Sequence, residues 1–158
     1  MRGKRTATGA ALAVGALAVT GLAFAPTALA VAPTSATITA DCGTFGGGPA
    51  TLTATQSGTS ATISLSSTAV TVPLALAKDS ITSKLTLVKA SGGTVVFSGK
   101  KNPAMAAGDP VSVGPLSGTV ASGDSLESFG GSLQMTVFGI NITCKATAKQ
   151  APGPFVFD

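Results

Sequence analysis

The sequence predicts an all-β protein: a single immunoglobulin-like β-sandwich of about eight to ten short strands, preceded by a cleaved signal peptide. Three observations predict this fold. Apolar residues alternate with Ser and Thr along most of the chain. Gly, Pro, Asn and Asp interrupt the alternation at intervals of roughly 8–12 residues, as in sandwiches. No long stretch has the apolar period of an amphipathic helix.

Four apolar sets with a period of two occupy the first half of the expected domain. They are Ala36, Ile38, Ala40 and Cys42; Ala50, Leu52 and Ala54; Ala61, Ile63 and Leu65; and Val70, Val72, Leu74 and Leu76. Each set predicts a half-buried strand with its hydroxyl-bearing neighbours facing outward. Pro73 interrupts the fourth set. Since proline donates no backbone hydrogen bond, we expect an edge or a kink there.

Six later strands are predicted at 82–88, 94–98, 110–113, 118–121, 133–138 and 140–147. The inward face changes from odd to even positions near Gly139, which predicts a β-bulge or a short turn. The only helix signal is Asp124 as a cap, with Glu127 three residues later and Gly130 as a stop. It predicts a single helical turn at most.

Residues 1–30 have the three parts of a secretory signal: a cationic start (Arg2, Lys4, Arg5), an apolar run over 7–25 and a small-residue exit. We expect cleavage between Ala30 and Val31. The alternative is an uncleaved anchor, because a spanning helix needs about 20 apolar residues. The Ala- and Gly-rich composition favours cleavage. The expected product is secreted, either extracellular or cell-wall associated, with no membrane segment left after cleavage.

Cleavage also removes most of the positive charge. The chain has a formal net charge of +4, and without its three N-terminal cations it has seven Lys against six acidic residues, or +1. It has no Trp, Tyr or His. A nucleic-acid surface needs clustered cations and aromatic side chains for stacking. We therefore expect no nucleic-acid partner.

Cys42 and Cys144 are the two cysteines of the chain. In an exported protein they are expected to form a disulfide, either between two sheets or between the ends of the domain. Zinc binding and redox catalysis are disfavoured, because the chain lacks His and a C-x-x-C pair.

No pattern in the sequence assembles a catalytic site, and we expect a non-enzymatic protein without cofactor or metal. The chain has no His to act as a base near neutral pH. A glycosidase-type carboxylate pair has no spacing to support it. The S-x-x-K match at 98–101 lacks its companion motifs. The acidic residues are Asp41, Asp79, Asp109, Asp124, Glu127 and Asp158.

The expected organisation is a signal at 1–30, a domain at 31–150, and a Pro/Gly linker with a short apolar tail at 151–158. We expect Phe97 and Phe138 in the core. Phe45 and Phe129 lie beside glycines and are expected either to cap the ends of the domain or to be exposed. The Phe155 and Phe157 tail is expected to be either docked or exposed.

Three segments carry a resemblance: DCGTFGG (41–47), GDPVSVGPLSGTV (108–120) and GINITCKA (139–146). With them, the chain resembles secreted actinobacterial two-cysteine β-sandwich domains of unknown function over most of residues 36–147. The resemblance implies an extracellular or envelope location and carries over the cysteine pair alone.

These expectations converge on a secreted or cell-envelope β-sandwich with a structural or binding role. Its partner would be an extracellular protein or an envelope polymer that the sequence does not identify, and the oligomeric state stays open. One alternative is an extracellular binder of an apolar small molecule, which a cavity of a few hundred Å³ would favour. Another is a hydrolase inhibitor with an exposed loop at 100–108.

Overall fold

The computed structural model describes residues 30–158; the signal predicted at 1–30 lies outside this range except for its last residue, Ala30. The described elements are β1 (Val31–Ala32), β2 (Ser35–Asp41), the 3-10 helix η1 (Gly43–Phe45), β3 (Gly47–Ser57), β4 (Ser60–Thr71), β5 (Thr82–Lys89), β6 (Thr94–Lys100), β7 (Pro110–Thr119), β8 (Ser125–Val137), β9 (Ile140–Ala146) and β10 (Phe155–Phe157). The all-β class predicted from the alternation is confirmed.

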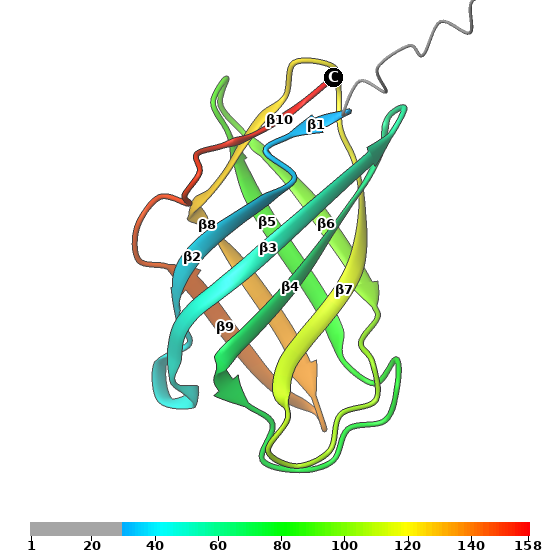
Figure 1. Ribbon diagram of the computed structural model, residues 1–158, viewed down its shortest axis with the longest axis vertical. Helices are drawn as coiled ribbons and strands as arrows, with labels where there is room; N and C mark the ends of the chain where they lie inside the picture. The colour runs from blue at the N-terminus through cyan, green and yellow to red at the C-terminus, as the bar shows by residue number, and fades with distance from the viewer. Residues whose placement is uncertain (1–29) are drawn as a thin grey trace, which may run out of the picture.

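The sheet closes into an eight-stranded β-barrel, so the predicted immunoglobulin-like sandwich is wrong. The ring runs β8-β5-β6-β7-β4-β3-β2-β9 and returns to β8, because β9 pairs with both β2 and β8 (Figure 1). Alternation with a period of two specifies one inward face per strand, which a sandwich and a barrel share. Closure depends on which distant strands pair, and the alternation does not encode that choice.

The inward faces predicted for the early strands are confirmed. Leu52 on β3 and Ile63 on β4 are fully buried, and the Ala residues beside them are nearly so. The fourth predicted set is split, because β4 ends at Thr71 and a loop follows. Pro73 therefore lies beyond the strand, and its missing N–H interrupts no ladder.

A single bulged strand replaces the two predicted at 110–113 and 118–121. In β7 the pairing with β4 shifts between Ile63 and Leu65, opposite Gly114. Gly114 has φ +108°, and a Cβ there would lie 2.8 Å from the Ser64 Cα. The bulge therefore requires glycine. Its residues are of kinds that also occur in turns, so in the sequence the bulge resembled a boundary between two strands.

The predicted helical turn at Asp124 is wrong, because β8 begins at Ser125. Glu127 pairs with Val88 in the β5–β8 ladder. Its Oε1 accepts the backbone N–H groups of Ser128, Phe129 and Gln150 at 2.9–3.2 Å. Long-range strand pairing overrides the local capping signal here. The short turn predicted near Gly139 is confirmed as the two-residue connection between Val137 and Ile140, which pair with each other.

One end of the barrel is covered by the short strands β1 and β10, seen at the top of Figure 1. β10 pairs with β8 and with β1. The Gln56 side chain, at the end of β3, binds both the N–H and the carbonyl oxygen of Asp158. Phe155 and Phe157 are fully buried, so the apolar tail is docked. We call this the closed end.

The closed end depends on a close approach at Gly118. The Phe97 ring lies 6.5 Å from the Phe157 ring, centroid to centroid. A Cβ at Gly118 would come within 2.6 Å of the Phe97 ring. The prediction that Phe97 belongs to the core is confirmed by its complete burial. Within residues 30–158, no helix has the length and apolar character needed to cross a bilayer.

Candidate functional site

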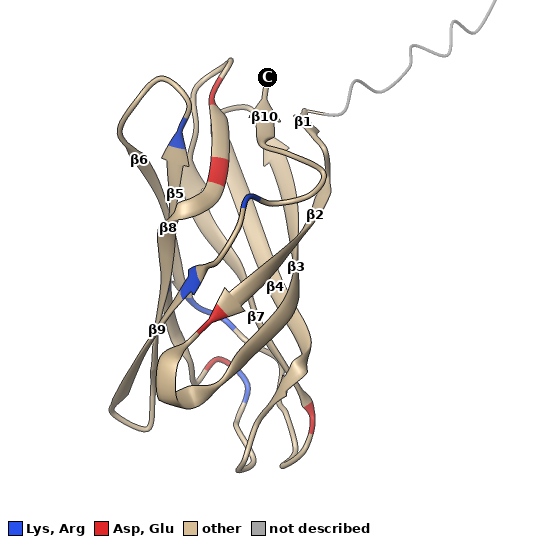
Figure 2. Ribbon diagram, turned by 90° about the vertical axis from the view of Figure 1, so that its left-hand side faces the viewer, with Lys and Arg blue, Asp and Glu red and all other residues tan. Residues whose placement is uncertain are grey.

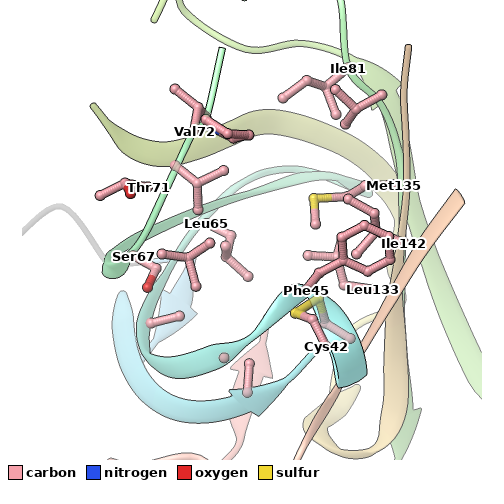
Figure 3. Close-up of a pocket in the computed structure, with 18 of the residues that line it drawn as sticks. Cys42, Phe45, Leu65, Ser67, Thr71, Val72, Ile81, Leu133, Met135 and Ile142 are labelled. Atoms are coloured by element: carbon pink, nitrogen blue, oxygen red, sulfur yellow. A yellow bond between two sulfur atoms is a disulfide. The ribbon is translucent and has the colours of Figure 1, made fainter. Parts of the chain in front are cut away.

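The other end of the barrel holds an open apolar cavity of about 380 Å³ (Figure 3). We call this the open end, and its cavity the pocket. Its walls come from the end of β2, η1, the start of β3, the end of β4, the following loop, β7, and the β8–β9 hairpin. The lining side chains labelled in Figure 3 are Cys42, Phe45, Leu65, Ser67, Thr71, Val72, Ile81, Leu133, Met135 and Ile142.

Small residues form one part of the pocket wall, and the alanines among them leave interior space that larger side chains could fill. Ala40 on β2 and Gly47, Gly48 and Ala50 on β3 all line it. Small barrels are normally filled by their own inward side chains. At Gly48 there is no room for a larger residue on that side, because a Cβ would lie 2.6 Å from the Ala69 Cβ. Leu65 on β4 and Met135 on β8 also line the cavity.

The pocket lining contains almost no polar side chain and no charged one. Ser67 and Thr71 are its two hydroxyl residues. The Ser67 hydroxyl donates to the Pro49 carbonyl oxygen at 2.6 Å and accepts the Ala69 N–H at 3.3 Å. It therefore has its own partners, and Thr71 is exposed at the margin. Figure 2 shows the charged residues of the described chain spread along the barrel.

The mouth of the pocket is rimmed by exposed apolar side chains. Phe45, Leu74, Phe138 and Ile140 are 48%, 62%, 68% and 52% exposed, and all four line the pocket. Among the described residues, seven large apolar side chains are exposed, so most of them lie at this mouth. Contiguous exposed apolar surface of this kind marks interaction sites.

Phe138 lies at the tip of the β8–β9 hairpin, so the prediction that it belongs to the core is wrong. Its φ is +50°, a left-handed conformation that a bulky residue rarely adopts. The alternation places Phe138 on the inward face itself, and the structure leaves it 68% exposed. The two-residue turn then points it out of the ladder, at the rim of the pocket.

Cys42 and Cys144 form a disulfide, as predicted, and both line the pocket. Ala40 pairs with Ala146 and Asp41 with Lys145, so the disulfide occupies the next position of the same register. It joins neighbouring strands of one barrel rather than two sheets. These two pairs are the whole β2–β9 ladder, so the covalent bond reinforces the seam where the barrel closes.

Two loops lie beside each other at the open end, one after β4 and one before β7. The first carries Leu76 and the second Met105, and their backbones bond to each other in both directions at 2.8–2.9 Å. Asn102, which is buried, accepts the N–H groups of Ser80 and Ile81 and donates to two carbonyl oxygens. The segment 100–108 is thus fastened to its neighbour, an arrangement that does not favour a protruding inhibitor loop.

The acidic residues are engaged in local structure. Asp41, Asp109 and Asp124 each accept a backbone N–H in a turn. Lys89 forms an ion pair with Asp124 at 2.9 Å, and Lys101 lies 3.9 Å from Asp79. The Ala121 N–H, and then Lys89, hold the pKa of Asp124 below its ordinary value of 3.8. In the part of the chain that the structure describes, no three acidic or sulfur ligands group as a metal site would require.

The pocket is the feature that sequence reasoning missed. The predicted cysteines are brought together in its wall, and the predicted cleavage point lies elsewhere, at the closed end, where Val31 begins β1. Small residues cluster at Ala40, at 46–48 and at Ala50, but Ala36 and Ala54 on the same strands also face inward, so small residues in the sequence do not by themselves locate the pocket. Comparison of the chain with protein-family models, curated proteins and solved structures finds no match.

Proposed function

We propose that this chain is a secreted, non-enzymatic binding protein that holds an apolar ligand in the pocket. The observation that carries the proposal is the open apolar cavity of about 380 Å³. Ligand pockets are typically clefts of about 300–1,000 Å³ with mainly apolar walls. The proposal takes up the small-molecule alternative weighed from the sequence and keeps the expectation of a protein without catalytic chemistry.

The energetics of the open end support ligand binding. Each Å² of apolar surface removed from water contributes about 25 cal/mol. The rim residues Phe45, Leu74 and Phe138 leave roughly half or more of their surface in water. A ligand seated between them would bury both its own surface and theirs. Side chains that served stability alone would gain by folding inward, as the phenylalanines of the closed end do.

We also propose that the protein is secreted. The predicted signal at 1–30 supports it, and a disulfide is compatible with an extracellular location. The proposal covers both a free protein and one attached to the cell wall. A carrier of apolar molecules outside the cell would suit either placement.

Binding can be tested with N-phenylnaphthylamine, a neutral fluorophore whose emission rises in apolar surroundings. The chain has no Trp or Tyr, so its own emission does not interfere. We expect a saturable increase on titration into the oxidised protein. We also expect the probe to raise the thermal midpoint, because a ligand that binds only the folded state stabilises it.

A variant with a filled pocket tests whether the probe binds there. Ala40→Phe with Ala50→Phe adds two rings to the pocket wall, and the cavity can accommodate them. We expect at least a tenfold loss of probe affinity. The matched control is Ala90→Phe with Ala121→Phe, which adds the same rings at exposed positions near the closed end. Absence of saturable binding to the unaltered protein, or equal binding by a folded filled variant, would overturn the proposal.

A further inference from the structure

We infer that the ligand is a single hydrocarbon chain that enters tail first and leaves its polar head in solvent at the mouth. This inference rests on the proposed function and deepens it. It is carried by three features: the hydrogen-bonding state of the lining, the size of the cavity, and the composition of the rim.

The lining offers no free polar side chain to a buried ligand group. The Ser67 hydroxyl already donates and accepts within the protein. The buried side-chain atoms without partners in the described chain, Ser83 Oγ and Gln150 Nε2, belong to residues outside the lining. A ligand hydroxyl, amide or carboxylate placed deep in the pocket would lose its water without replacement, which is costly. The buried part of the ligand must therefore be hydrocarbon.

The cavity volume sets the length of that hydrocarbon. A dry apolar cavity of about 150 Å³ holds one benzene molecule, with its six carbons. By proportion, a cavity of about 380 Å³ holds roughly 15 carbons. The lining follows β8 and β9 from Leu133 and Cys144 to the hairpin tip. Five residues of strand span about 17 Å, which suits an elongated molecule.

The residues of the rim indicate what surrounds the ligand where it leaves the pocket. Phe138 and Ile140 on the hairpin lie with Leu74 and Phe45 around the opening, and no charged residue joins them in the lining. Apolar side chains would contact the last buried carbons as the chain leaves the protein. A head group beyond them meets water and Thr71, so its charge should matter little to affinity.

Displacement of N-phenylnaphthylamine from the oxidised protein tests each feature, with all competitors kept below their micelle concentrations. Linear fatty acids from eight to eighteen carbons form the first series. We expect affinity to rise about fourfold per methylene, from about 0.8 kcal/mol for each one buried, and to level off at roughly 12–16 carbons. Dodecanol, dodecanoic acid and dodecyltrimethylammonium should agree within about fivefold.

Dodecanedioic acid is the decisive competitor, because it matches dodecanoic acid in length but carries a carboxylate at both ends. Tail-first binding predicts at least thirtyfold weaker displacement by the diacid. Equal displacement by the two acids would overturn the inference while leaving the proposed function intact. A fused-ring sterol that displaces better than every linear chain would overturn the single-chain assignment, as would a preference above tenfold for one head-group charge. Failure of the probe to bind at all would refute the proposed function itself.

Discussion

The two ends of the barrel are made from the same alternating strands, yet they place their aromatic side chains in opposite ways. At the closed end, Phe155 and Phe157 belong to β10, and both are fully buried where β10 pairs with β1 and β8. At the open end, Phe45 and Phe138 are 48% and 68% exposed at the mouth of the pocket. The closed end carries the packing that stabilises the fold, and the open end keeps a space that packing would have filled.

The two ends are also held together by different forces. The closed end combines buried rings with an ion pair between Lys89 and Asp124. The backbone carbonyl oxygen of Asp124 also accepts the Phe157 N–H. The open end depends on the disulfide at a two-pair seam and on Asn102 in its loops. The covalent bond secures the wall of the open end, where its two cysteines line the pocket. That difference allows one end to be hollow in a small domain.

Removal of the disulfide should give one of the two largest losses of stability. The bond joins residues 102 positions apart, and a loop of about 100 residues corresponds to roughly 4.7 kcal/mol of chain entropy. We expect Cys42→Ala with Cys144→Ala to lower the free energy of unfolding by about 3–5 kcal/mol. Denaturant unfolding followed by far-ultraviolet circular dichroism measures it. The reduced native chain is the control, and an unchanged midpoint in both would contradict the assigned role of the seam.

The stability of the protein should also respond very differently to the loss of a buried and of an exposed phenylalanine. Phe157→Ala removes a fully buried ring and should cost about 3–5 kcal/mol of unfolding free energy. Phe138→Ala removes an exposed ring and should change stability by about 0.5 kcal/mol or less. The same unfolding experiment compares them. Probe affinity should reverse the order, with Phe138→Ala weakening binding more than Phe157→Ala does; similar stability losses would abolish the distinction between the ends.

Asp124→Asn should have the smallest effect, and that effect should depend on pH. The folded-state pKa of Asp124 is lowered, so its contribution is present above its ordinary value of 3.8 and is lost as the pH falls below it. At pH 7 we expect a loss of about 1–2 kcal/mol, as for a charge-assisted hydrogen bond in a turn. Well below pH 3.8 the variant and the native chain should converge. A constant difference across that range would refute the assignment.

Local sequence patterns predicted much of this molecule, and the failures have identifiable causes. Inward positions on β3 and β4 followed the alternation, and the Gly139 turn followed the change of face. The capping signal at Asp124 failed because pairing of β8 with β5 outweighs one helical turn. Phe138 failed because the turn residue next to Gly139 points out of the ladder. The pocket was missed because the alternation marks a residue as facing inward. It does not show whether other side chains fill the part of the interior that this residue faces.

The sequence by itself determined the all-β class, most strand positions, the inward faces and the pair of cysteines that would join, because each depends on local periodicity or on residue chemistry. Only the tertiary structure decided that β9 lies between β2 and β8 and closes a barrel. It also decided that the tail seals one end while small residues leave the other hollow. The physical reason is that closure and cavity volume depend on distances between strands far apart in the chain, to which no local pattern is sensitive.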